Sequence, residues 1–101
     1  MFFKKKPKLN NPDILAFINH RAVKYVTTRG DDNIEYVIGK SGIMSISGDE
    51  LVIFCNANEV FRCNIYQAEM GELLSHDGVR IKSTDDDGKT HSVVAYYTYK
   101  R

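Results

Sequence analysis

The sequence predicts a mainly β domain of the α+β class. About seven antiparallel strands would form a barrel or a two-sheet sandwich, with one helix before the first strand. From Ala22 onward, apolar and polar residues alternate in short segments, the pattern of strands with one buried face. Turn sequences rich in Gly, Asp and Asn separate these segments. Because short turns join consecutive strands, neighbouring strands are expected to pair antiparallel.

Length and charge indicate one domain with a basic extension. The 101 residues have the size of a single core, and we expect residues 1–10 to form a flexible basic N-terminal tail before one domain at 11–101. Four of the fourteen cationic side chains lie in residues 1–8, which leaves ten cationic and thirteen acidic side chains, a net of −3, in the other 93 residues. A mildly acidic body gives no reason to expect a surface for nucleic acid.

The helix is predicted over residues 12–21. Asn11 suits the N-cap, Pro12 the first helical position and Asp13 the positive end of the helix dipole. His20 and Arg21 would meet the negative end. Apolar side chains recur at three- and four-residue spacing and predict a stripe that packs on the sheet: Ile14, Leu15, Phe17, Ile18 and Ala22.

Seven segments are predicted to be strands: 22–29, 34–38, 43–47, 51–55, 60–65, 79–82 and 91–99. The segment 39–42 reads Gly-Lys-Ser-Gly and is interpreted as a turn. The strand 51–55 is apolar on both faces, which is typical of a central strand covered on both sides. The segment 66–74 stays open between a short helix and an irregular crossing, and Gly71 argues against a long helix.

Seven strands and one helix resemble the inventory of a pleckstrin-homology-like (PH-like) barrel, although there the helix follows the strands. The segments VFRCNI, GELLSHDGVRI and VVAYYTYKR, within residues 42–101, also resemble small uncharacterised bacterial proteins of one domain. This resemblance implies a β-rich, PH-like body and no known activity, and it supplies no functional residues.

No motif predicts an enzyme, a metal site or a cofactor. The chain has no nucleotide-binding or nucleophile-elbow motif. The three histidines, His20, His76 and His91, show no paired spacing that suits zinc. Cys55 and Cys63 are expected to be reduced, buried thiols of a cytoplasmic protein, since no secretion signal precedes them. The acidic segment 85–88 fails the EF-hand template and is interpreted as a hairpin turn.

Two surfaces are candidates for binding. The basic-aromatic tail could contact anionic membrane or phosphates, or remain a solvated terminus; its residues are Phe2, Phe3, Lys4, Lys5, Lys6 and Lys8. The C-terminal tyrosines Tyr96, Tyr97 and Tyr99 could form a protein-interaction surface or belong to the core and rim.

The sequence therefore favours a cytoplasmic, non-enzymatic binding or interaction module of unknown ligand. The expected partner is a protein, with a homodimer through an open strand edge as one form. The alternatives are a peripheral membrane protein that uses the tail, a non-specific nucleic-acid binder, and a small-molecule carrier. Nucleic acid is disfavoured by the acidic body, and a carrier by the small interior of seven strands.

Overall fold

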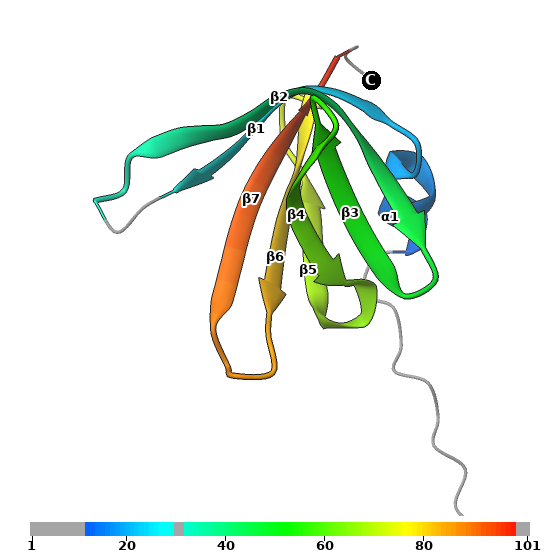
Figure 1. The fold of residues 1–101 in the computed structure, drawn as a ribbon, viewed down its shortest axis with the longest axis vertical. Helices are drawn as coiled ribbons and strands as arrows, with labels where there is room; N and C mark the ends of the chain where they lie inside the picture. Colours follow the sequence, from blue (N-terminus) through cyan, green and yellow to red (C-terminus); the bar gives the residue numbers. More distant parts are fainter. Residues whose placement is uncertain (1–11, 30–31, 99–101) are drawn as a thin grey trace, which may run out of the picture.

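A single sheet of seven antiparallel strands organises the described residues of the computed structural model, which are 12–29 and 32–98. The strands lie in the order β4-β3-β2-β1-β7-β6-β5. One short helix, α1, accompanies them (Figure 1). The elements in chain order are α1 Pro12–Ile18, β1 Ala22–Arg29, β2 Glu35–Ser47, β3 Glu50–Cys55, β4 Asn58–Asn64, the 3-10 turn η1 Ile65–Gln67, β5 Ala68–Glu72, β6 Gly78–Thr84 and β7 Thr90–Tyr97. The mainly β class with one preceding helix is confirmed.

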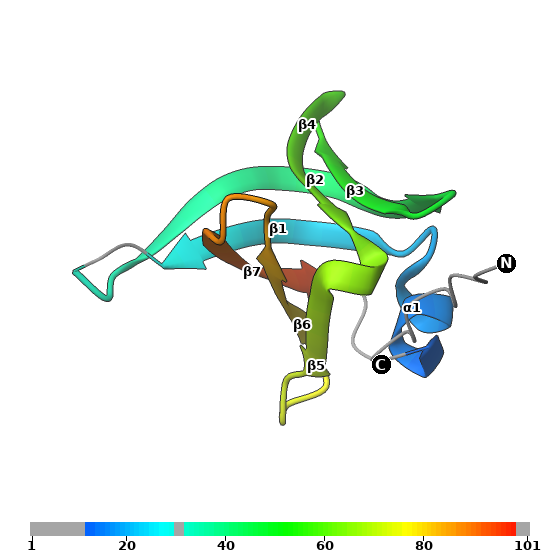
Figure 2. The same cartoon turned by 90° about the horizontal axis from the view of Figure 1, so that it is seen from below.

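The sheet curls strongly but does not close, so the expected closed barrel or two-sheet sandwich is wrong. The two edge strands, β4 and β5, are consecutive in the chain, and η1 redirects the backbone between them instead of pairing them. Figure 2 shows the two ends of the sheet bending toward one another. Side chains hold part of the seam: the Ser83 hydroxyl hydrogen-bonds the Cys63 thiol, and Gln67 donates to Asp86 over 3.2 Å.

The core lies on the concave side of this curl, because each strand turns alternate residues inward. Its most buried large side chains come from α1 and five of the strands: Ile18, Val23, Val26, Met44, Leu51, Ile53, Val79, Ile81 and Tyr97. Strand β3 is buried at Leu51, Val52, Ile53 and Cys55, as its sequence predicts, whereas Glu50 and Phe54 are exposed. On the outer face Val52 lies opposite Arg62 in the β3–β4 register.

Helix α1 covers one open end of the curled sheet and is shorter than expected. It ends at Ile18, three residues before the predicted end, because His20 adopts the left-handed conformation at φ 65°. Phe17 meets Tyr97 of β7 edge to face at 5.5 Å between ring centroids. Arg21 stacks on Phe17 and donates to its carbonyl oxygen over 3.3 Å. The guanidinium of Arg21 thus meets the C-terminal end of α1, as expected, although Arg21 itself follows the helix and does not belong to its last turn.

The predicted turn at 39–42 is wrong, because β2 runs through it as one strand of 13 residues. Its glycines serve close packing instead. A Cβ on Gly42 would lie 2.0 Å from the carbonyl oxygen of Phe54, and a Cβ on Gly39 would lie 2.7 Å from the sulfur of Cys55. Between them, Ser41 takes a left-handed φ of 54°, which kinks the strand without breaking it.

The expected number of strands is right, but two of the assignments behind it are wrong. The two strands predicted at 34–38 and 43–47 are one strand, β2. The segment 66–74, left open between helix and crossing, contains the 3-10 turn and the strand β5. Ala68 and Met70 of β5 are buried and alternate with exposed residues, which is a strand pattern too short to recognise beside Gly71.

Candidate binding surface

The β1–β2 hairpin projects away from the rest of the sheet (Figure 1). We define the hairpin arm as residues 26–29 of β1, the turn residues 32–34 and residues 35–41 of β2. Strand β3 pairs with β2 only from Gly42 onward, so the far part of β2 has a neighbour, β1, on one side alone. The molecule measures 48 × 30 × 29 Å along its principal axes.

The hairpin arm carries four of the seven large apolar side chains that are exposed in the described chain. Ile34 is 55% exposed, Tyr36 48%, Val37 52% and Ile38 36%. These four lie within five consecutive residues, whereas Ile43 and Phe54 form one cross-strand pair of β2 and β3, and Leu74 lies in the turn before β6. Scattered apolar side chains are ordinary on a surface, but a contiguous exposed group marks an interaction site.

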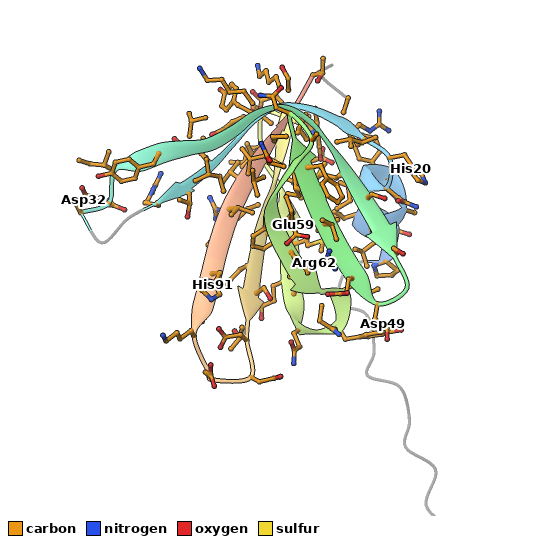
Figure 3. The ribbon with its side chains drawn as sticks, in the orientation of Figure 1. His20, Asp32, Asp49, Glu59, Arg62 and His91 are labelled. Carbon is orange, nitrogen blue, oxygen red and sulfur yellow. The ribbon has the colours of Figure 1, made fainter. Side chains whose placement is uncertain are left out.

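The tip of the hairpin arm is ordered by its own side chains. Asp32, labelled in Figure 3, accepts hydrogen bonds from the backbone N–H of Ile34 over 3.0 Å and from the hydroxyl of Tyr36 over 2.5 Å. The Tyr36 hydrogen bond lowers the pKa of Asp32, and the same bond raises the pKa of Tyr36. The turn is therefore a built structure that presents the apolar residues behind it.

A polar clamp joins the start of β2, beside the turn of the hairpin arm, to β7. Glu35 accepts hydrogen bonds from Thr27 over 2.5 Å and from the hydroxyl of Tyr96 over 3.0 Å. These two bonds, that of Thr27 first, lower the pKa of Glu35. The ring of Tyr96 in turn packs on Tyr25 at 4.6 Å between centroids. The hairpin arm is therefore held in one orientation relative to the sheet.

A groove of about 600 Å³ lies where the sheet fails to close, between β4 and the start of β7. Val60, Phe61 and Val93 give it apolar walls, and Ile38 of the hairpin arm reaches its rim. Figure 3 shows its polar residues on β4 and β7, Glu59, Arg62 and His91.

Arg62 is fully engaged within this groove. Its guanidinium contacts Glu50 at 2.9 Å and Glu59 at 2.7 Å, and its hydrogen bond lowers the pKa of Glu59. These exposed pairs orient the side chains over Val52 and contribute little to stability. Arg62 is thus poorly placed to recruit an anionic ligand.

The two cysteines are free and buried, as expected. In the register of β3 and β4, Cys55 lies opposite Asn58 and Cys63 opposite Leu51, so the two sulfurs do not face each other. Burial raises the pKa of both thiols, that of Cys63 to about 11. A thiol of that kind is a poor nucleophile at neutral pH.

We expect both thiols to resist modification in the folded protein. With a pKa near 11, only about one Cys63 thiol in a thousand is ionised at pH 8, and burial adds a steric barrier. Labelling with Ellman's reagent at pH 8 should be at least about a hundredfold slower in the native protein than in urea. Rapid stoichiometric labelling without urea would contradict this assignment to the core.

Two histidines and the acidic turn form local turn structures. His76 contacts Glu72 at 2.5 Å, and His91 contacts Asp85 at 3.1 Å. Asp85 also accepts from the backbone N–H groups of Asp87 and Lys89, which confirms the predicted hairpin turn and lowers the pKa of Asp85, with the His91 contact as the largest cause. Within residues 12–29 and 32–98, no three His, Cys, Asp or Glu side chains gather as a metal site would require.

The three C-terminal tyrosines have different surroundings. Tyr97 is 1% exposed and belongs to the core, so it offers no surface to a partner. Tyr96 lies half-buried on the outer face, in the clamp with Glu35. Tyr99 lies outside the described residues. The sequence pattern placed Tyr96 and Tyr97 on opposite faces correctly but did not identify the hairpin arm, because its apolar residues were assigned to a buried strand face.

The tail residues also lie outside the described part of the chain, so their binding roles remain predictions. They are Phe2, Phe3, Lys4, Lys5, Lys6 and Lys8. Among the residues that are described, no helix has the length and apolar character that a bilayer crossing requires. Comparison with protein-family models, curated proteins and solved structures finds no match for this chain.

Proposed function

We propose that this protein is a cytoplasmic, non-enzymatic interaction module on a PH-like scaffold, and that the hairpin arm is its protein-binding surface. The observation that carries the proposal is the exposed apolar group at 34–38 on a projecting, internally ordered hairpin. The seven strands and one helix support the PH-like resemblance, from which the chain departs by its N-terminal helix and its open sheet.

The partner we propose is a second copy of this chain. Residues 35–38 of β2 have no second strand beside them, and β3 and the turn after it approach only at Gly39 and Ser41. Such an unpaired strand edge is a template for another strand. Two copies related by a two-fold axis can pair this edge antiparallel, because both offer the same strand. Pairing centred on Val37 and Ile38 would cover the exposed apolar residues of both copies.

Charge complementarity supports the antiparallel arrangement. Glu35 stands at one end of the exposed segment and Lys40, which is also exposed, at the other. Antiparallel pairing brings the acidic end of each segment beside the basic end of its partner. Cross-strand pairs of opposite charge stabilise a sheet, whereas parallel pairing would place like charges together.

The variant Val37→Lys tests this proposal. We expect the wild-type protein to dimerise across a micromolar concentration series in sedimentation equilibrium. The variant should associate at least about tenfold more weakly, because the dimer would bring two lysines together at an edge that must lose water. Val37 is exposed, so the circular-dichroism spectrum should not change.

The matched control is Leu74→Lys, which places the same charge on an apolar residue that is 99% exposed and outside the hairpin arm. It should dimerise like the wild type. A wild-type protein that stays monomeric throughout the series, or equal weakening in both variants, would contradict self-pairing through the hairpin arm.

A further inference from the structure

Three cationic side chains line one cavity on the outer face of the sheet, which shares Thr28, Arg29 and Ser92 with the groove. Arg29 comes from β1, and Arg80 and Lys82 come from β6; we call them the outer-face cation cluster. They line one cavity of about 380 Å³ together with Thr27 and Ser92. The cavity therefore combines three positive charges with the carboxylate of Glu35 and the hydroxyls of Thr27, Thr28 and Ser92.

The strand register accounts for this convergence. Lys82 lies opposite Ser92 in β7, and Arg80 lies opposite Val94, whose other neighbour is Thr27 in β1. Because alternate residues of a strand share a face, burial of Val79, Ile81 and Ser83 turns Arg80 and Lys82 outward. The same alternation brings Arg29 out beside Thr27. The cation cluster is thus built on three paired strands and not on loops.

The three cations have little local compensation. Arg62 has two carboxylate partners, but no ion pair or hydrogen bond joins Arg80 or Lys82 to another described side chain. Arg29 contacts the side-chain oxygen of Asn33 at 3.5 Å, at the limit of a hydrogen bond. This is notable because the described residues contain twelve carboxylates and eight Lys or Arg side chains.

The neighbouring carboxylates do not neutralise the cavity. Glu35 is the only acidic residue among those that line it; its charge attracts Arg29 and offsets one of the three cations, so the lining keeps a net charge of +2. Glu69 lies opposite Lys82 in β5, but no ion pair joins them within the described residues. Next to Arg80 the sheet carries Gly71, where a Cβ would meet no atom within 4 Å, so that flank of the guanidinium is open.

We propose that this cavity binds the phosphate group of a small phosphorylated molecule. Two guanidinium groups can donate paired hydrogen bonds to phosphate oxygens, Lys82 adds a point charge, and the hydroxyl of Ser92 can donate a further bond. The surrounding body is acidic, with a net charge of −4 over the described residues. This repels a long polyanion more than a compact one, so a small ligand suits the cavity better than a nucleic acid.

Titration with inorganic phosphate and with pyrophosphate, followed by 1H–15N correlation spectra at constant ionic strength, tests the proposal. We expect saturable shifts at the amides of Thr27, Arg29 and Ser92, with pyrophosphate binding more tightly than phosphate. The double variant Arg80→Gln, Lys82→Gln should weaken pyrophosphate binding at least about tenfold, since each loses a charge-assisted bond.

The control double variant Lys24→Gln, Lys89→Gln removes the same two charges from exposed positions that do not line the cavity. It should change pyrophosphate affinity by less than about twofold at constant ionic strength. Equal weakening in both double variants, or shifts that do not saturate, would overturn the proposal. Saturable binding of a single-stranded oligonucleotide or of anionic vesicles without saturable pyrophosphate binding would also overturn it.

Discussion

Replacement of Gly42 by Ala is expected to lower the free energy of unfolding by about 3 kcal/mol, near the upper end of the range for overpacked cores. The added Cβ would lie 2.0 Å from the carbonyl oxygen of Phe54 and 2.7 Å from the sulfur of Cys55. A side chain could rotate away, but a backbone carbonyl inside the β2–β3 ladder can move only if the ladder opens. Urea unfolding should therefore show a lower midpoint, with roughly 10 °C or more lost from Tm.

Gly71→Ala is the matched control for this change. Gly71 also lies within a strand, but a Cβ there meets nothing within 4 Å and the backbone has no positive φ. We expect its free energy of unfolding to stay within about 0.5 kcal/mol of the wild type or to rise slightly. Equal destabilisation by both substitutions would mean that crowding against β3 is not the reason for Gly42.

Replacement of Tyr97 by Ala is expected to cost about 3–5 kcal/mol, the range for large aromatic side chains in cores. Tyr97 heads the fully buried side chains by volume, and its ring packs edge to face against Phe17 of α1. Its loss would leave a cavity between the helix and the sheet. Chemical denaturation measures the loss, and amide exchange in α1 should rise because the helix loses its main aromatic contact.

Tyr36→Ala provides the comparison, since it removes the same side-chain atoms from a residue that is 48% exposed on the hairpin arm. It should lower the free energy of unfolding by no more than about 1 kcal/mol, through the lost hydrogen bond to Asp32. A cost for Tyr97→Ala no larger than that for Tyr36→Ala would show that α1 is not anchored through this ring.

Local chemistry was sufficient to predict the helix start and most of the strands. Pro12 suits the helix start because it has no N–H to be left unpaired there, and Asp13 complements the positive end of the helix dipole. The helix end was misplaced, because His20 has a left-handed backbone that non-glycine residues adopt only when tertiary contacts favour it. Here the N–H of His20 donates to the carbonyl oxygen of Met44 over 2.8 Å, a contact 24 residues distant in sequence.

The turn at 39–42 was predicted wrongly because glycine has two uses in a sheet: it forms turns, and it allows strands to pack closely. Gly39 and Gly42 read as a turn, because turn glycines and packing glycines are the same in sequence. Only the approach of β3 distinguishes them. The open seam between the two edge strands, β4 and β5, could not be predicted either, since local alternation does not determine whether the edges of a curled sheet will pair.

The candidate surfaces were the hardest to predict. The alternation of Ile34, Tyr36 and Ile38 resembles a buried strand face, and nothing nearby in sequence shows that β3 stops short of them. Arg29, Arg80 and Lys82 are separated by up to 53 positions along the chain, and only the order β1-β7-β6 gathers them. Tyr96 was identified from its position on the last strand, but its bond to Glu35 was not.

The unbroken length of β2 has a mechanical consequence. The same backbone that forms the hairpin arm continues into the core, where it carries Met44. A tensile load applied to the hairpin arm would therefore pass directly into the hydrogen bonds between β2 and β3, loading them in shear along the strand axis. Strand β2 continues unbroken through its kink at Ser41, so the load would reach the core along one strand.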